Sequence, residues 1–309
     1  MVICKSLNTI PNLDKSVLTI GSFDGMHRGH QEVIKDVKFR ADGKNIPSVA
    51  ITFDPHPKSI LHSNVQENWN ILTSADKKLE LLEKNGIDYV LLIPFDMEFA
   101  KITAQDFMDN FIIKYFNPEQ IVIGYDHHFG YKREGDAEFL KKQNDKYNFN
   151  LNVIEPLKID GLTVSSTKIR EYIQNCDIEA ANNYLGWEYE LSGVVVKGEG
   201  IGSKIGFPTA NIKPEFQTQL IPGQGAYCVD VVVNNKIYPG MCNIGNRPTF
   251  HDDGNNVIEV NLISEDKLSL LDENITINFK IYIRQEKKYE NKIDLVRQLK
   301  LDRQFCLSY

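Results

Sequence analysis

The sequence predicts an α/β domain built on a parallel sheet, followed by a small antiparallel β barrel or sandwich that ends in a helix. Up to about residue 185, apolar runs of strand length alternate with stretches of helical periodicity, as in βαβ units. Beyond it, short β-branched runs alternate with Gly, Pro and Asn, as in small antiparallel folds. The chain has 309 residues, which at ~150 residues per domain corresponds to about two domains.

The first part is expected to alternate strands with helices. The strands are predicted at 17–20, 49–53, 89–93 and 121–123, and the helices from residue 29 onward, at 77–85 and at 104–115. In parallel sheets of this kind, ligands bind beyond the carboxyl ends of the strands. The loops that follow the strands are therefore where a site is expected.

The second part is expected to consist mostly of strands. They are predicted at 193–196, 227–233, 237–241, 257–262 and 275–283, with a helix at 292–301. Asn234 and Asn235 separate two of these runs and favour a hairpin turn. The boundary is expected near 184–188, which gives domains at 1–185 and 186–309.

Composition and charge exclude several classes of protein. Hydrophobic residues make up 42% and charged residues 25%, an ordinary globular composition. The 42 acidic and 35 basic residues give a net charge of -7, which argues against a nucleic-acid partner. No apolar run approaches the ~18 residues of a membrane span, and the first residues do not resemble a signal peptide. A cytoplasmic protein without membrane association is expected, and the sequence does not set its oligomeric state.

The five cysteines are scattered, odd in number and form no C-x-x-C motif. This pattern argues against a zinc site and against a disulfide framework. Free, buried thiols in a reducing compartment are the expectation.

Residues 21–30 read Gly-Ser-Phe-Asp-Gly-Met-His-Arg-Gly-His and follow the first predicted strand directly. Gly21 and Gly25 allow a tight turn and a close approach to a ligand. His27 and His30 flank the start of the following helix, where free N–H groups attract anions. Two imidazoles there can stabilise the charge on a phosphoryl group that loses pyrophosphate. The alternative is a glycine-rich turn with two surface histidines.

Three further segments follow predicted strands or begin helices. Residues 52–57 read Thr-Phe-Asp-Pro-His-Pro, and residues 124–130 read Gly-Tyr-Asp-His-His-Phe-Gly. In residues 164–170, Ser166 precedes Lys-Ile-Arg at a helix start, where its hydroxyl can cap the helix or bind phosphate. Arg170 would add a bidentate positive charge. A plain helix cap with a surface arginine is the alternative.

Residues 198–211 form the most distinctive stretch of the second half. They match neither the phosphate loop G-x-x-x-x-G-K-[ST] nor G-x-G-x-x-G. Pro208 favours an extended backbone, so Thr209 and Asn211 point to the same side. Both carry neutral oxygens suited to Mg²⁺ that arrives with ATP phosphates. The alternative is a flexible hairpin with two solvated polar residues.

Residues 257–262 alternate in polarity, which places Glu259 on the opposite face from its apolar neighbours. A carboxylate there could accept the proton of a hydroxyl that attacks a γ-phosphate. The alternative is an ordinary surface glutamate.

The string G-x-F-D-G-x-H-x-G-H resembles the H-x-G-H signature of the nucleotidyltransferase superfamily, and G-F-P-T-A-N resembles the ATP-Mg²⁺ site of riboflavin kinases. Together the motifs resemble the bacterial bifunctional riboflavin kinase/FAD synthetase family. The resemblance implies a Rossmann-like nucleotidyltransferase domain followed by an antiparallel β-barrel kinase domain. It implies phosphorylation of riboflavin to FMN, then AMP transfer from ATP to FMN to give FAD and pyrophosphate, with Mg²⁺ accompanying ATP.

The resemblance also implies roles for individual residues. The catalytic residues would be His27, His30 and Glu259. The nucleotide-binding residues would be Gly21, Phe23, Asp24, Ser165, Ser166, Thr167, Arg170, Gly198, Gly200, Gly202, Gly206, Pro208, Thr209 and Asn211. Thr209 and Asn211 would also hold the metal, and Asp126, Phe129 and Arg284 would contact the flavin.

Two segments depart from the family pattern. Tyr125 and His127 replace an acidic and an apolar-aromatic residue, and the loop after Glu259 lacks the usual Asp-Phe and Tyr-Gly. The altered loop leaves open a monofunctional FMN adenylyltransferase with an impaired kinase domain. A flavin-binding regulator without turnover is a third hypothesis, against which the intact histidine pair and Glu259 argue.

Overall fold

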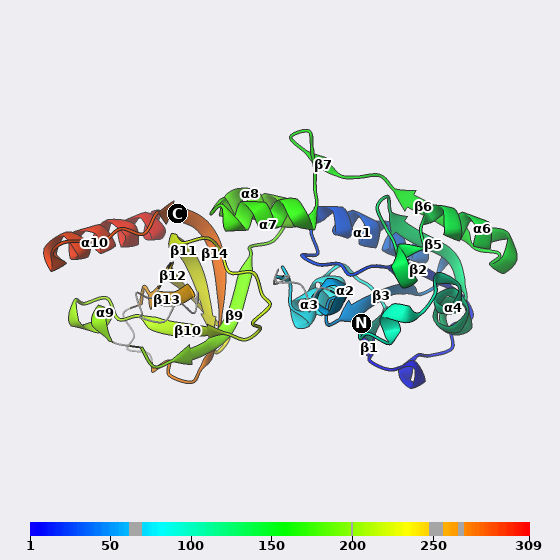
Figure 1. Ribbon diagram of the computed structural model, residues 1–309, viewed down its shortest axis with the longest axis horizontal. Helices are drawn as coiled ribbons and strands as arrows, with labels where there is room; N and C mark the ends of the chain where they lie inside the picture. The colour runs from blue at the N-terminus through cyan, green and yellow to red at the C-terminus, as the bar shows by residue number, and fades with distance from the viewer. Residues whose placement is uncertain (62–69, 199, 247–255, 265–268) are drawn as a thin grey trace. The chain divides into compact units, whose positions relative to one another are not determined.

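The computed structural model describes residues 1–61, 70–198, 200–246, 256–264 and 269–309 (Figure 1). These residues divide into two compact units, Met1–Ser166 and Thr167–Tyr309. No helix in the described part of the chain is long and apolar enough to cross a membrane.

The first unit is built on a six-stranded sheet with the order β1-β4-β3-β2-β5-β6. Its strands are β1 (Val2–Cys4), β2 (Ser16–Ile20), β3 (Ser48–Asp54), β4 (Tyr89–Pro94), β5 (Pro118–Gly124) and β6 (Asn150–Ile154). Every pair is parallel, which confirms the predicted sheet. The four predicted strands are β2 to β5. The two edge strands were not predicted, and apart from the buried Cys4 their residues are exposed or half-buried.

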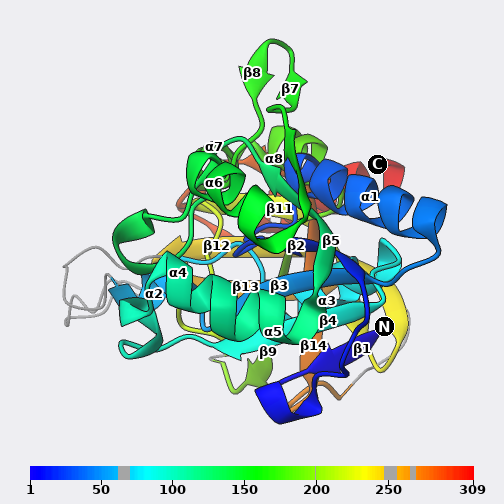
Figure 2. The same cartoon turned by 90° about the vertical axis from the view of Figure 1, so that its right-hand side faces the viewer.

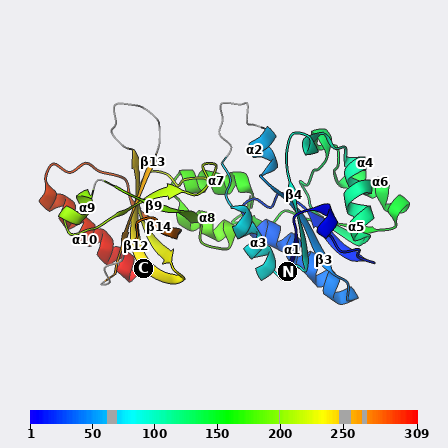
Figure 3. The same cartoon turned by 90° about the horizontal axis from the view of Figure 1, so that it is seen from below.

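Helices cover both faces of this sheet. They are α1 (Arg28–Lys44), α2 (Pro57–Leu61), α3 (Ala75–Lys84), α4 (Ala104–Phe107), α5 (Lys114–Phe116) and α6 (Ala137–Tyr147). Figure 3 shows α1 and α3 on one face, with α4 and α6 on the other. The helix predicted at 104–115 is present, with a π-helical segment, Met108–Ile113, between α4 and α5.

The core of this unit lies between the sheet and the α4–α6 side. Alternate strand residues such as Leu18, Val49 and Ile121 pack there against Phe107 and Phe116. On the other face, α1 buries Val33, Ile34, Val37 and Ala41, spaced as on one side of a helix. A short hairpin of β7 (Lys158–Ile159) and β8 (Leu162–Thr163) projects from the unit (Figure 2).

The second unit contains a closed antiparallel barrel with the strand order β10-β13-β12-β11-β14-β9. Its strands are β9 (Glu190–Val196), β10 (Ala210–Pro214), β11 (Gly225–Val233), β12 (Lys236–Asn246), β13 (Asn256–Leu262) and β14 (Asn274–Arg284). The structure is thus a barrel and not a sandwich. Asn234 and Asn235 have φ of 48° and 61°, which confirms the hairpin turn.

The described residues of the second unit also form the helices α7 (Ser166–Gln174, whose first residue belongs to the first unit), α8 (Ile178–Leu185), α9 (Ile201–Lys204) and α10 (Lys292–Ser308). The side chain of Asn182 on α8 donates to the carbonyl of Phe279 and accepts from the N–H of Tyr189, both at 2.8 Å. These bonds attach α8 to the barrel. The predicted terminal helix is present and extends seven residues beyond its expected end at residue 301.

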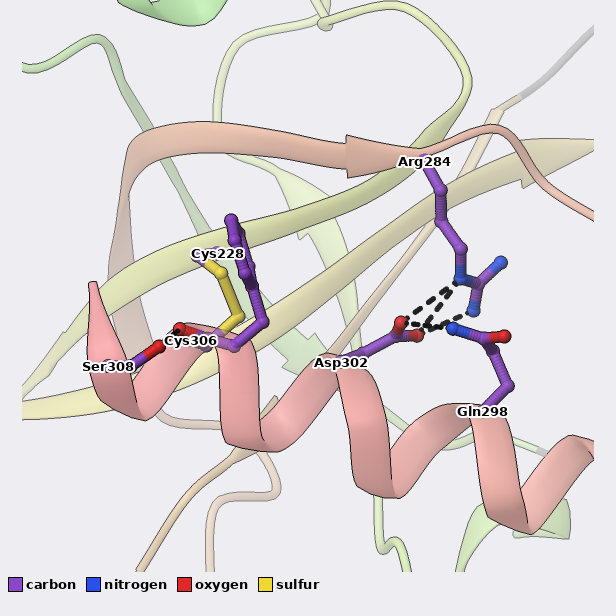
Figure 4. The surroundings of a disulfide bond; sticks show 7 residues. Cys228, Arg284, Gln298, Asp302, Cys306 and Ser308 are labelled. Carbon is purple, nitrogen blue, oxygen red and sulfur yellow. Dashed lines mark hydrogen bonds and ion pairs between the residues drawn. A yellow bond between two sulfur atoms is a disulfide. The ribbon is translucent and has the colours of Figure 1, made fainter.

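Two contacts fasten α10 to the outside of the barrel (Figure 4). Cys228 on β11 and Cys306 on α10 form a disulfide, with their Cα atoms 5.2 Å apart. The guanidinium of Arg284 on β14 pairs with Asp302 at 2.6 Å, and Gln298 donates to the same carboxylate. The expectation of free thiols is therefore wrong for Cys228 and Cys306, because the folding of α10 onto β11 brings distant positions together. The structure places Cys4, Cys176 and Cys242 as free cysteines.

Candidate functional site

The segment between β2 and α1 forms a turn with an unusual backbone. Phe23, Gly25 and Met26 have φ of 48°, 81° and 35°. Only Gly adopts such angles without cost, and each non-Gly residue there stores ~1 kcal/mol or more. The Phe23 and Met26 side chains are buried, which holds the strained backbone in place. Such strain is typical of segments that serve a ligand.

The two histidines of the motif lie together at the start of α1. Nδ1 of His27 accepts the N–H of His30 at 3.2 Å and so caps the helix. A neutral His27 ring therefore carries its proton on Nε2. The two rings stack with centroids 3.6 Å apart. The structure thus brings the predicted pair together at one helix terminus.

His30 is held as a neutral imidazole. Burial, reinforced by His27 and by the charge of Lys78, lowers the pKa of His30 well below its usual value. Its buried Nδ1 has no hydrogen-bond partner among the described residues. Buried polar atoms of native proteins normally have a partner, so an unpaired one fits a position that a ligand completes.

Hydrogen bonds of the Asp24 side chain hold the turn in place. Its carboxylate is 3% exposed and accepts the N–H groups of Leu72 and Thr73 at 2.9 and 3.3 Å. The Thr73 hydroxyl also accepts the N–H of Gly25. These contacts tie the turn to the segment that precedes α3. Nucleotide binding by Asp24, which the sequence resemblance implies, stays a prediction.

Ser166 lies against the same turn, because its hydroxyl donates to the carbonyl of Asp24 at 2.9 Å. This bond joins two predicted segments that lie far apart in the sequence. Ser165 is half-buried beside it. Thr167 and Arg170 follow on α7 within the second unit, so their approach to the turn stays a prediction.

The loop at 124–130, which was predicted to contact the flavin, contains both exposed and buried residues. Asp126 is exposed, whereas Phe129 is 7% exposed and packs among Phe107 and Phe139 of the core. Burial lowers the pKa of His127 to about 4. Phe129 thus supports the loop from within, and flavin contact by either predicted residue stays a prediction.

In the barrel unit, the glycine-rich segment lies directly over the predicted ATP-binding residues. A Cβ atom on Gly198 would come within 2.0 Å of Nδ2 of Asn211, and one on Gly202 within 3.1 Å of Oγ1 of Thr209. Only glycine permits this close approach. The glycine segment therefore lies against Thr209 and Asn211, and nucleotide binding by these residues stays a prediction.

The other glycines of this segment serve its turns. Gly200 and Gly206 have φ of 66° and 82°, with no neighbouring atom near a Cβ at either position. After them, Pro208 accepts a hydrogen bond at its carbonyl from Nδ2 of Asn261 at 2.7 Å. This bond fastens the start of β10 to β13.

Glu259 lies on β13 opposite two polar residues. Its register partners are Asn211 on β10 and Asn243 on β12. Ile258 and Val260 are buried, so Glu259 faces the other side of the strand, as the alternation predicted. Asn243 was not among the residues predicted from the sequence.

Arg284 occupies a different environment from the one expected. Its Nε and Nη2 both donate to the carboxylate of Asp302, which is 3% exposed. Such an ion pair attaches β14 to α10. A flavin contact by Arg284 stays a prediction.

Thr209 and Asn211 fit the metal that accompanies a nucleotide. Hard neutral oxygens such as theirs suit Mg²⁺, which binds few protein ligands and keeps waters and phosphates. Within the described ranges, no three His, Cys, Asp or Glu side chains gather as a metal site. The chemistry of the donors therefore favours an ion shared with ATP.

Comparisons with known proteins cover both units. A model of the FAD synthetase family matches residues 9–168, and a model of the riboflavin kinase family matches residues 185–309. A bifunctional riboflavin kinase/FMN adenylyltransferase of Listeria monocytogenes is 35% identical, over 93% of this chain and 90% of that protein. One of the same description from Escherichia coli is 33% identical, over 96% and 95%.

A crystal structure from Streptococcus pneumoniae, described as a macrolide-efflux protein, shares the whole fold. Its TM-score is 0.87 at 29% identity, and the match covers 100% of this chain and 99% of that one. The two family models thus cover most of both units, and the curated relatives overlap this chain almost completely. This chain belongs to the bifunctional riboflavin kinase/FMN adenylyltransferase family.

Proposed function

We propose that this chain makes FAD from riboflavin in two ATP-dependent steps, with AMP transfer in residues 1–185 and riboflavin phosphorylation in residues 186–309. The observation that supports the proposal is that one chain carries two separate arrangements suited to bind phosphate. One is the stacked His27–His30 pair, and the other is the glycine segment beside Thr209 and Asn211.

In the first site, a phosphate oxygen of FMN attacks the α-phosphorus of ATP, and the bond to pyrophosphate breaks. No side-chain nucleophile is needed, since the substrate supplies it. Nε2–H of His27 donates to the phosphate oxygens as charge develops on them, and His30 binds beside it. Ser166, at the start of α7, offers N–H groups to the triphosphate, and Arg170 adds charge.

In the barrel, the 5′-hydroxyl of riboflavin attacks the γ-phosphorus of ATP. Glu259 accepts the hydroxyl proton as the bond to phosphorus forms, and ADP leaves. The backbone at Gly198, Gly200, Gly202 and Gly206 covers the phosphates. Thr209 and Asn211 would hold Mg²⁺, which would neutralise phosphate charge when bound.

Further parts of the proposal rest on composition and on the family. Riboflavin, FMN, FAD and ATP are the small-molecule partners, Asp126 and Phe129 lie on the flavin side, and the protein is cytoplasmic. Its net charge of -7 gives no general attraction for nucleic acid, so the anionic nucleotides are collected by local donors.

Two variants test the assignment of each reaction to its site. The double variant His27→Ala with His30→Ala should lower AMP transfer to FMN by about 10³-fold and leave riboflavin phosphorylation unchanged. Glu259→Gln should lower phosphorylation by about 10²–10⁴-fold and leave AMP transfer unchanged. Each is measured by separating flavins after incubation with ATP and Mg²⁺.

Normal FAD output from the histidine variant would refute the role of the pair. Riboflavin phosphorylation at the wild-type rate by Glu259→Gln would refute the role of Glu259 as proton acceptor. If the unmodified chain makes FAD from FMN but nothing from riboflavin, the chain is a monofunctional adenylyltransferase.

A further inference from the structure

A buried lysine lies beside the first site and has no place in the mechanism above. Lys78 on α3 is 4% exposed. Its ammonium donates to the carbonyl of Phe53 at 2.9 Å and to Oγ1 of Thr52 at 3.3 Å. Both acceptors are neutral and belong to the carboxyl end of β3, the edge where parallel sheets bind ligands.

The ammonium is only partly satisfied by these contacts. A lysine has three N–H donors, and the two acceptors leave one donor unused among the described residues. No carboxylate pairs with it directly in that part of the chain, although Asp24 and Asp54 lie near enough to act on its charge. A buried cation without a counter-ion is costly, and an anionic substrate would offset the cost.

Hydrogen bonds also connect Lys78 to the turn that carries the histidines. Oγ1 of Thr52 accepts from Lys78 and donates to the carbonyl of Ser22 at 3.3 Å. At the base of α3, Asp24 binds the N–H groups of Leu72 and Thr73. The helix that carries Lys78 is thus attached to the turn at two places.

We propose that Lys78 is a positioning residue for AMP transfer: its ammonium holds the end of β3 against the Gly21–His30 turn and places a fixed positive charge where the phosphates of FMN and ATP bind. Lys78 acts through its hydrogen bond to Thr52 and through the electrostatic effect of its charge on His30. This inference rests on the proposed function of the first site.

The charge of Lys78 should also set a pH limit. Burial lowers the pKa of Lys78 to about 8, while Asp24 in the turn and Asp54 at the end of β3 act in the opposite direction. The charge is present at pH 7 and is lost as the pH rises above 8. His30 also faces this region, but its pKa is well below its usual value, so it stays neutral throughout. The value of kcat/KM for FMN should therefore fall above about pH 8.

The test compares Lys78→Met, Lys78→Arg and Lys84→Met, an exposed position in the last turn of the same helix. Lys78→Met should lower kcat/KM for AMP transfer by about 100-fold at pH 7, Lys78→Arg should recover at least tenfold of that loss, and Lys84→Met should match wild type. Riboflavin phosphorylation by the same chain serves as the internal control and should not change.

Two readouts separate this role from a merely structural one. Methionine removes an uncompensated buried charge and keeps the volume, so the melting temperature of Lys78→Met should equal or exceed that of wild type. The wild-type decline of kcat/KM above pH 8 should be absent in Lys78→Met.

Unchanged AMP transfer in Lys78→Met would overturn the inference. It would also be overturned if Lys78→Met had a lowered melting temperature and the kcat/KM of wild type did not decline above pH 8. If wild type itself makes no FAD from FMN, the proposed function fails and not the role of Lys78 alone.

Discussion

At the residue scale, His27 and Asn211 each combine a structural contact with a proposed role in substrate binding. The His27 ring caps α1 through Nδ1, which places the proton of the neutral ring on Nε2, the atom that donates to phosphate oxygens in the proposed mechanism. Asn211 lies under Gly198 and opposite Glu259. In the proposed mechanism, the same side chains therefore serve both local folding and substrate binding, through different atoms.

The residues that sequence could identify lie in contiguous motifs. His27, His30, Thr209 and Asn211 are read directly from strings whose spacing has a physical reason. Lys78 is different, because its partners lie 25 and 26 positions away in the sequence. One available indication was its place three and four residues before Leu81 and Leu82, on the apolar side of α3.

Gly198→Ala is a prediction at this scale. The new methyl group would overlap the Asn211 amide, whose Nδ2 lies 2.0 Å from the ideal Cβ position, and would displace this side chain, which we propose binds ATP. We expect kcat/KM for riboflavin phosphorylation to fall about 10²-fold, with AMP transfer unchanged. Gly43→Ala is the matched control, because no atom lies within 4 Å of its Cβ position. Equal phosphorylation by the two variants would contradict the packing argument.

At the scale of elements, regular strands and helices were predictable and their connections were not. Strands β2 to β5 can be predicted because each contains a run of apolar residues. Short elements escaped, such as β1, β10 and α9, because three to five residues carry too little periodicity. The disulfide escaped for a related reason: it depends on where α10 packs, which no local pattern determines.

Cys306→Ser tests the attachment of α10. The disulfide joins positions 78 residues apart and restricts the unfolded chain, so under oxidising conditions its loss should cost about 2–4 kcal/mol of unfolding free energy. The variant and wild type should become similar in dithiothreitol, because both then keep the Arg284–Asp302 ion pair and the apolar packing of Val296 and Leu299 but lack the disulfide. Cys176→Ser, which removes a free thiol, is the control. Identical denaturation midpoints for wild type and Cys306→Ser without reductant would contradict this attachment.

At the scale of the molecule, the order of a parallel α/β unit and an antiparallel β unit was predictable from one change in the sequence pattern. Alternating strand-like and helical stretches give way to short β-branched runs near residue 185. The choice of barrel over sandwich came from family resemblance, since alternation alone fits both. The exact division was not readable: the compact units divide after Ser166, whereas the family models end at residue 168 and begin at residue 185. Helices α7 and α8 fall in this interval and fold with the barrel.

The central claim is that one chain performs two reactions at two independent sites. Mixing the His27→Ala/His30→Ala variant with Glu259→Gln, in riboflavin, ATP and Mg²⁺, tests it most directly. Alone, the first should stop at FMN and the second should leave riboflavin unchanged. Together they should form FAD after a lag, because FMN released by one chain is used by the other. FAD formed from riboflavin at the wild-type rate by either variant alone, or no more FAD in the mixture than in the separate variants, would contradict the account.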